Sequence, residues 1–213
     1  MGGMSMLPDA PEGYRELFLT FAMWSVMMVG MMTATAAPLI MLFTGMSEKR
    51  GDPGASIKAM FLGLGYLTVW VSFSAAAALG QWGLQRELLL SSDMVVTSPI
   101  AAGLILISAG AYQLTPAKRA CLRQCQSPLG FLMANWRDGA AGAFAMGLRH
   151  GLFCLGCCWA LMTVLFVVGI MNLAWVALLT VFVLAEKFGK GGVLVMRAGS
   201  ILMIGYGTLI LAI

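Results

Sequence analysis

The chain has 213 residues, of which 60% are hydrophobic and 10% are charged, and its formal net charge at pH 7 is +4. A soluble domain of this size needs more charge to cover its surface, so the composition excludes that class and indicates an integral membrane protein. The small positive charge is better explained as a signal for membrane topology than for nucleic-acid binding, and we expect no nucleic-acid partner.

The first residues, 1–16, lack the pattern of a secretory signal peptide, because they are net acidic and have no basic region before the apolar stretch. Apolar stretches of roughly 18 residues or more follow, and stretches of that length are typical of transmembrane helices. We therefore expect an all-α, polytopic transmembrane bundle that forms a single domain over residues 1–213. Its six helices are predicted at residues 17–45, 57–81, 94–114, 142–168, 171–186 and 193–213.

The helix predicted at 17–45 carries a run of methionines. Met23, Met27 and Met31 recur every four residues and share one stripe of the helix, beside an adjacent stripe with Met28 and Met32. Thioethers stacked in this way are suited to passing Cu(I) along a helix. The alternative is that methionine, a flexible side chain, fills irregular gaps between helices.

The longest polar connection, residues 115–141, contains a short helix that we expect near 116–127. Thr115-Pro116 is typical of a helix start, and Pro128 follows the expected end. Cys121 and Cys125 lie four residues apart and therefore on one face. The basic residues around them predict an amphipathic helix at the membrane interface, with its basic side toward anionic headgroups.

The helix predicted at 142–168 holds the densest group of candidate metal ligands, in the stretch HGLFCLGCCW. If His150 defines zero on a helical wheel, Cys154 lies near about +40°, Cys157 near about −20° and Cys158 near about +80°. Imidazole and thiolate donors on one stripe form a ligand set suited to Cu(I), with zinc as the second choice.

The same helix also supports an explanation by packing alone. Ala143, Gly147 and Gly151 recur every four residues and form a small-residue face, to which Cys154 and Cys158 also belong. Free cysteine packs as a small apolar residue. Packing accounts for each cysteine separately but does not require a histidine beside them, so the cluster as a whole favours metal chemistry.

Basic residues gather on one side of the predicted bundle and set its expected topology. The opposite side has only Arg15 and Arg86. By the positive-inside rule the basic loops face the cytoplasm, so both termini are expected outside. Glu186 and Lys187, at the end of the fifth helix, are expected to pair with each other. The residues on the basic side are Lys49, Arg50, Lys58, Lys118, Arg119, Arg123, Arg137, Lys187, Lys190 and Arg197.

Three stretches of the chain, in order, resemble a bacterial membrane family of unknown function that is described as predicted metal-binding integral membrane proteins. They are MWSVMMVGMMTATAAPLI, YQLTPAKRACLRQCQSPLGFL and GLRHGLFCLGCCWALM, and the resemblance spans about residues 21–187. It implies a bacterial inner-membrane location and metal binding. The ligands that it implies are Cys121, Cys125, His150, Cys154, Cys157 and Cys158.

Three functions are consistent with these patterns. The first is binding of a soft metal ion, foremost Cu(I), for delivery, storage or efflux. The second is a non-catalytic subunit of a larger bacterial membrane complex, in which the cysteines serve packing. The third is a thiol relay through Cys154 and Cys157. An enzyme is not favoured, because the sequence shows no catalytic constellation. As partners we expect the lipid bilayer and either another membrane protein or further copies of this chain.

Overall fold

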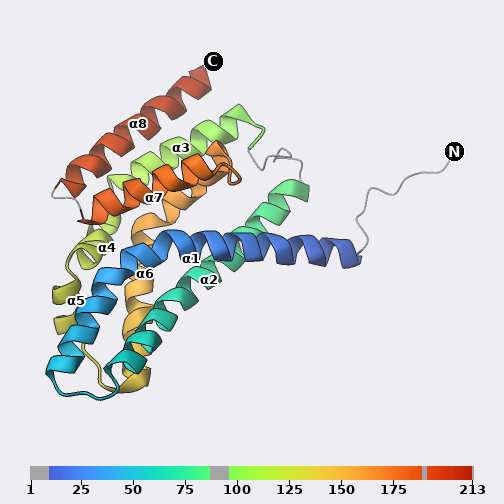
Figure 1. The fold of residues 1–213 in the computed structure, drawn as a ribbon. Helices are drawn as coiled ribbons and strands as arrows, with labels where there is room; N and C mark the ends of the chain where they lie inside the picture. The colour runs from blue at the N-terminus through green and yellow to red at the C-terminus, as the bar shows by residue number, and fades with distance from the viewer. Residues whose placement is uncertain (1–9, 87–95, 189–190, 213) are drawn as a thin grey trace.

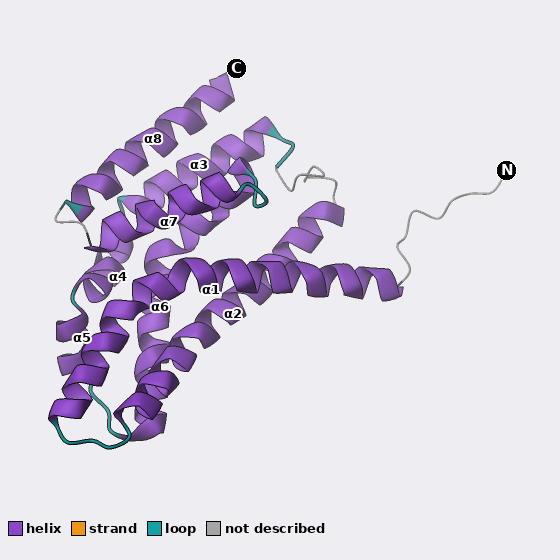
Figure 2. Ribbon diagram, viewed as in Figure 1, coloured by secondary structure: helices purple, strands orange, loops and turns teal. Residues whose placement is uncertain are grey.

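The computed structural model describes residues 10–86, 96–188 and 191–212. Within these ranges the protein is an all-α bundle, as the sequence predicts (Figures 1 and 2). The helices are α1 (Ala10–Lys49), α2 (Ala55–Arg86), α3 (Pro99–Gln113), α4 (Pro116–Gln126), α5 (Pro128–Asn135), α6 (Gly139–Val168), α7 (Leu173–Phe188) and α8 (Gly192–Ala212).

Four of the described helices, α1, α2, α6 and α8, are long and apolar enough to cross a membrane. The pair α3 and α4, which is bent by 63°, would provide a fifth span if the two helices act as one. The helix expected at 171–186 is present as α7 but has only 16 residues. That is shorter than the roughly 20 residues typical of a helix that crosses the hydrocarbon layer, and α7 is not among the four helices that are long enough.

The predicted boundaries differ from the observed ones where prolines begin helices. The helix expected from residue 94 begins at Pro99, after the N-cap Ser98, whose side chain accepts a hydrogen bond from the amide of Ala101. Residues 94 and 95 lie outside the described residues, as does residue 213 at the end of the last expected helix. Pro128 does not only end α4, as expected; it also begins α5, a helix that was not predicted.

The packing of α2 against α6 uses the small-residue face expected on α6. Ala143, Gly147 and Gly151 are buried. A β-carbon on Gly147 would overlap the carbonyl oxygen of Leu62 in α2, and one on Gly65 in α2 would overlap the backbone of α6. The two backbones are therefore in direct contact, which side chains larger than hydrogen would prevent.

The first helix bends over the other elements rather than running straight. Figure 1 shows that the axis of α1 changes direction along its length, and Pro38 lies inside this helix. Proline removes a backbone hydrogen bond and bends a helix. The earlier part of α1 is tied to α2, since Trp24 Nε1 donates a hydrogen bond to Gln81 Oε1 at 2.7 Å. As a result α1 brings its methionines against the central core.

The short helix α4 is amphipathic, as expected, but one of its basic residues faces inward. Lys118 is fully buried, and its Nζ lies 2.8 Å from Oε2 of the buried Glu186 in α7. Arg119 and Arg123 are exposed. The expectation that the whole basic side faces headgroups is wrong for Lys118, because a carboxylate 68 residues later in the chain provides a buried partner.

Candidate metal site

Four of the five cysteines meet in the centre of the molecule. Cys125 of α4 and Cys154, Cys157 and Cys158 of α6 are all buried and belong to one apolar core cluster. The Sγ atoms of Cys125 and Cys157 are 3.9 Å apart, and those of Cys157 and Cys158 are 3.3 Å apart. Cys154 also interacts with these three side chains. We call these four residues the thiol cluster.

Cys154 carries the polar contacts of the thiol cluster. Its Sγ accepts a hydrogen bond from Lys187 Nζ at 2.9 Å and lies 3.0 Å from the hydroxyl of Tyr66. That hydroxyl also lies 2.9 Å from Thr35 Oγ1. A buried ammonium needs an anionic partner, and the sulfur that it contacts is the group that can take the negative charge. This arrangement favours a thiolate at Cys154.

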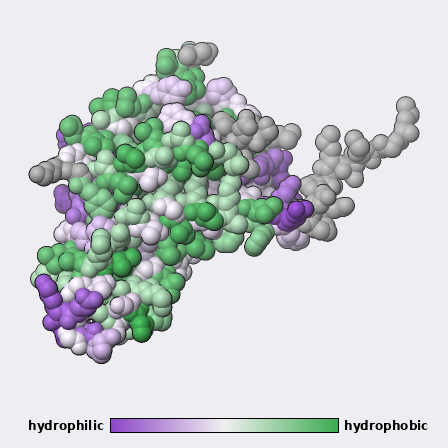
Figure 3. All heavy atoms as spheres, viewed as in Figure 1, coloured by the Kyte–Doolittle hydropathy of each residue, from purple (hydrophilic) through white to green (hydrophobic). Residues whose placement is uncertain are grey.

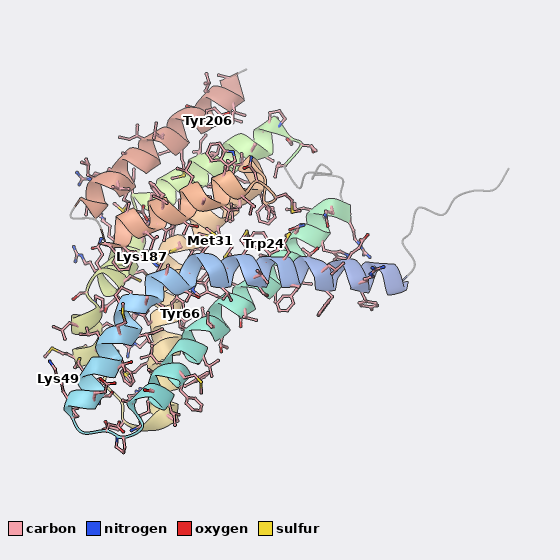
Figure 4. The ribbon with its side chains drawn as sticks, viewed as in Figure 1. Trp24, Met31, Lys49, Tyr66, Lys187 and Tyr206 are labelled. Atoms are coloured by element: carbon pink, nitrogen blue, oxygen red, sulfur yellow. The ribbon has the colours of Figure 1, made fainter. Side chains whose placement is uncertain are left out.

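Glu186 and Lys187, two consecutive residues of α7, contact two different helices. Glu186 and Lys187 were expected to pair with each other, and this was wrong: Glu186 pairs with Lys118 of α4, and Lys187 contacts Cys154 of α6. Adjacent helical residues point about 100° apart, so they reach two different neighbours. Figure 4 shows Lys187 near the end of α7, on the side that faces the body of the bundle. Lys118 and Lys187 are therefore core residues and not charges of water-facing loops, whereas Lys190 lies outside the described residues.

His150 lies one helical turn before Cys154 and is 3% exposed. Its ring packs edge-on against Phe131, with the ring centroids 4.9 Å apart, and lies 6.0 Å from the ring of Tyr66. Its Nδ1 atom is buried and has no hydrogen-bond partner. A buried nitrogen without a partner is costly in a protein core and marks a position where a ligand or ion can supply the missing interaction.

The methionines of α1 line the same core. Met31 is 4% exposed and belongs to the cluster that contains the four cysteines, and Met23 and Met27 are partly buried and pack against it. Met28 and Met32, from the adjacent stripe, are fully buried in that cluster. The structure thus places thioethers from both stripes in or against the core cluster that contains the thiols (Figure 4, where Met31 is labelled).

Cys121 lies apart from the thiol cluster, although it is one turn from Cys125. It is only partly buried. Its sulfur lies against Gly156 of α6, where an added β-carbon would come within 2.8 Å of it. Gly156 therefore lets α4 approach α6, and the Cys-x3-Cys spacing places one thiol in the core and the other at its edge.

The distance between two of the sulfurs is compatible with a shared metal ion. A metal–sulfur bond of about 2.3 Å places two sulfurs about 3.8–4.6 Å apart, depending on coordination geometry. The distance from Cys125 to Cys157, 3.9 Å, matches this range, whereas Cys157 and Cys158 are too close together to bind one ion without rotation. Among the described residues, no three His, Cys, Asp or Glu side chains are grouped to hold an ion as they stand. The distance from Cys125 to Cys157 corresponds to an angle of about 116° at a shared ion, so the pair fits two ligands of a three- or four-coordinate site whose other ligands must first move into place.

The sequence model of a family described as "PpoB2: Copper chaperone" matches residues 21–210. The chain belongs to the PpoB2 copper chaperone family. This family membership supports the metal-related part of the expectations from sequence, and its match includes α1 from its methionines onward, the thiol cluster and Lys187. No curated protein and no solved structure matches the chain.

Sequence reasoning missed three residues that shape the site of this PpoB2 family member, namely Tyr66, Thr35 and Lys187 as a partner of Cys154. Tyr66 and Thr35 lie in long apolar helices, where nothing in their local sequence sets them apart. Lys187 had a signal, because a lysine near the end of a short apolar helix needs a buried partner if it does not reach water. The identity of that partner required the fold.

Proposed function

We propose that the protein binds Cu(I) at the thiol cluster inside a membrane-embedded helix bundle and delivers it to another acceptor. The observation that carries this proposal is the meeting of Cys125 from α4 with Cys157 from α6, beside a Cys154 that contacts the ammonium of Lys187. Soft thiolates select Cu(I) among the ions available to a cell, and zinc is the second choice. Cys158, His150 and Met31 are further donors within the same core.

Delivery is favoured over storage by the incomplete arrangement of the ligands. A storage site would be expected to enclose its ions fully, whereas the described thiols need rotation before a third ligand can join. Ligand exchange between sulfurs is then direct, because an incoming donor can take an open position on the ion. Family membership in the copper chaperones supports the same choice over efflux.

A membrane location is supported by the surface as well as by helix length. Large apolar side chains such as Phe18, Leu104, Leu178 and Ile201 are exposed, and green, apolar residues cover much of the face in Figure 3. Exposed apolar surface on this scale is unstable in water and stable in lipid. We propose the lipid bilayer as a partner and the bacterial inner membrane, implied by the sequence resemblance, as the location.

Titration of the purified, reduced protein with Cu(I) against a chromophoric competitor tests the proposal. The variant Cys154→Ser/Cys157→Ser should lose at least about tenfold in Cu(I) affinity, a loss typical of damage to a metal site. Cys121→Ser is the matched control, since it makes the same change at a thiol outside the cluster, and should keep wild-type affinity. Wild-type protein that binds no Cu(I), or a double variant that binds it normally, would contradict the proposal.

The alternative is a non-catalytic subunit of a larger membrane complex. The observation that supports it is the exposure of α8. Only 17% of the most apolar stretch of this helix is buried, which leaves a long face for another helix or a second copy of the chain. Under this alternative, replacing all four thiol-cluster cysteines with alanine should preserve function and assembly, and larger partners should remain bound in mild detergent. Loss of function with intact assembly would reject it.

A further inference from the structure

A cavity of about 570 Å³ lies where the end of α7, the start of α8 and the end of α4 come together. Figure 1 shows these three segments close to one another at one edge of the bundle. Its polar lining comes from Gln126 of α4, Lys187 of α7 and Arg197 of α8. A space of a few hundred cubic ångströms is the size that holds a small molecule and is too small for a folded protein.

This cavity is joined to the thiol cluster through one side chain. Lys187 lines the cavity, and its Nζ also lies 2.9 Å from Cys154 Sγ. Lys187 is therefore shared by the cavity lining and the thiol cluster. Among the described hydrogen bonds, this one joins the cavity lining to a cysteine, which makes Cys154 the candidate acceptor.

The charge of the cavity restricts what can enter it. Lys187 and Arg197 are both cationic, and among the described lining residues none is acidic. The nearby carboxylate of Glu186 does not offset them, because it is held by Lys118 and accepts a further hydrogen bond from Gln113. Because the ammonium of Lys187 contacts Cys154, Arg197 supplies the main uncompensated charge of the cavity. This charge repels a bare Cu(I) cation and attracts an anionic complex.

We infer that this cavity is the port through which Cu(I) is exchanged, and that its ligand is a small, anionic bis-thiolate complex of Cu(I). The inference rests on the proposed Cu(I) function. In the exchange, a bond between copper and a carrier sulfur breaks as a bond between copper and Cys154 Sγ forms. The carrier thiolate leaves with its electron pair, and copper stays Cu(I) throughout, so no oxidant or reductant is needed.

The test compares two sources of Cu(I) on the full chain in detergent. The first is the glutathione complex, which is anionic, and the second is the acetonitrile complex, which is cationic. Arg197→Glu reverses one charge of the port. It should slow loading from the glutathione complex by about tenfold or more, the range of electrostatic steering, and should not slow loading from the acetonitrile complex. The effect should shrink as salt is raised.

Arg123→Glu is the matched control. It makes the same charge change on the exposed face of α4, away from the cavity lining, and should load at the wild-type rate from both sources. Equal slowing by both variants, or no slowing by Arg197→Glu, would overturn the port while leaving Cu(I) binding intact. Failure of wild-type protein to take Cu(I) from either source would instead overturn the proposed function.

Discussion

Two helix pairings in this molecule solve the same packing problem with different chemistry. The pair α3 and α8 meets through small residues, since Gly103, Gly110 and Gly207 each leave room for the other helix. Its described polar link is a single neutral hydrogen bond of 2.7 Å from Ser200 Oγ to the carbonyl of Gly110. Around α4, α6 and α7, by contrast, the core contains a buried ion pair, a second buried lysine and four thiols.

The comparison separates what the fold needs from what a site needs. The pair α3 and α8 shows that close backbone contact and apolar side chains are enough to hold two of these helices together. Burying a charge costs several kcal/mol before its partner offsets the loss. The charges around α4, α6 and α7 are therefore not explained by packing, and their contact with Cys154 connects them to the chemistry of the thiol cluster.

The largest expected effect comes from breaking the buried ion pair. Glu186→Gln leaves the ammonium of Lys118 without its anion and should lower the free energy of unfolding by about 3–5 kcal/mol. Ser200→Ala, which removes the hydrogen bond between α8 and α3, should cost only about 1 kcal/mol. Reversible denaturation in detergent measures both. If the two variants were equally stable, the contrast between the regions would be lost.

A smaller effect is expected from adding one methyl group to each pairing. Gly147→Ala would bring a β-carbon into deep overlap with the carbonyl oxygen of Leu62 and should cost about 2–3 kcal/mol. Gly110→Ala would meet Cγ1 of Ile204 at 2.7 Å and the carbonyl oxygen of Ser200 at 3.0 Å, a milder overlap that should cost about 1 kcal/mol. Because α2 carries Tyr66, only Gly147→Ala should also weaken Cu(I) binding. Unfolding experiments and Cu(I) competition on the same samples check this pattern, and equal Cu(I) affinities would contradict it.

A further effect is expected from the hydroxyl of Tyr66. Tyr66→Phe removes the group 3.0 Å from Cys154 Sγ and should weaken Cu(I) binding by about tenfold, as expected for a partner of a metal ligand. Tyr112→Phe is the control, because its hydroxyl donates to the carbonyl of Gly156 and contacts no described sulfur. Both variants should lose about 1 kcal/mol of stability. An unchanged Cu(I) affinity in Tyr66→Phe would show that this hydroxyl serves only packing.

The smallest effect is expected outside the core, in the connection between α1 and α2. A hydrogen bond from Lys58, with a further one from the amide of Gly54, holds the pKa of Asp52 below its usual 3.8. The carboxylate therefore stabilises this turn at pH values above 3.8, and the contribution is lost as pH falls through the lowered value. As the pH falls through the lowered pKa of Asp52, hydrogen exchange at the Gly54 amide should accelerate relative to exchange at other turn amides. Asp52→Asn should remove that pH dependence.

The sequence predicts the helices well because their signals are local. Long apolar stretches require helix in lipid, and Pro99 and Pro116 both begin helices after a Ser or Thr cap. The short α5 carries the same signal, since Ser127 precedes Pro128, but in the sequence this pair was interpreted only as the end of α4, and the helix follows without a polar break. The 16-residue length of α7 equals the length that the sequence predicts, but an apolar stretch near the lower limit does not reveal whether the helix spans the membrane.

The site is less predictable because its contacts join distant parts of the chain. On a helical wheel of α6 the side chains of Cys154 and Cys157 point in similar directions, and the sequence alone predicts this. That Cys125 rather than Cys121 reaches Cys157 depends on how α4 rotates against α6. The pairing of Lys118 with Glu186 depends on the same rotation. The packing and metal explanations of the α6 stripe also prove compatible, since its glycines bring Tyr66 toward Cys154.

The adjacency of Glu186 and Lys187 fixes the register of α7 in the bundle. One residue anchors α4 and the next anchors α6, so a slip by a single position would rotate α7 by about 100° and separate both pairs at once. Single-residue insertions or deletions between Leu173 and Glu186 should therefore be rare among natural variants of this chain. Length changes in the connection before α7 leave that register untouched and should be common by comparison.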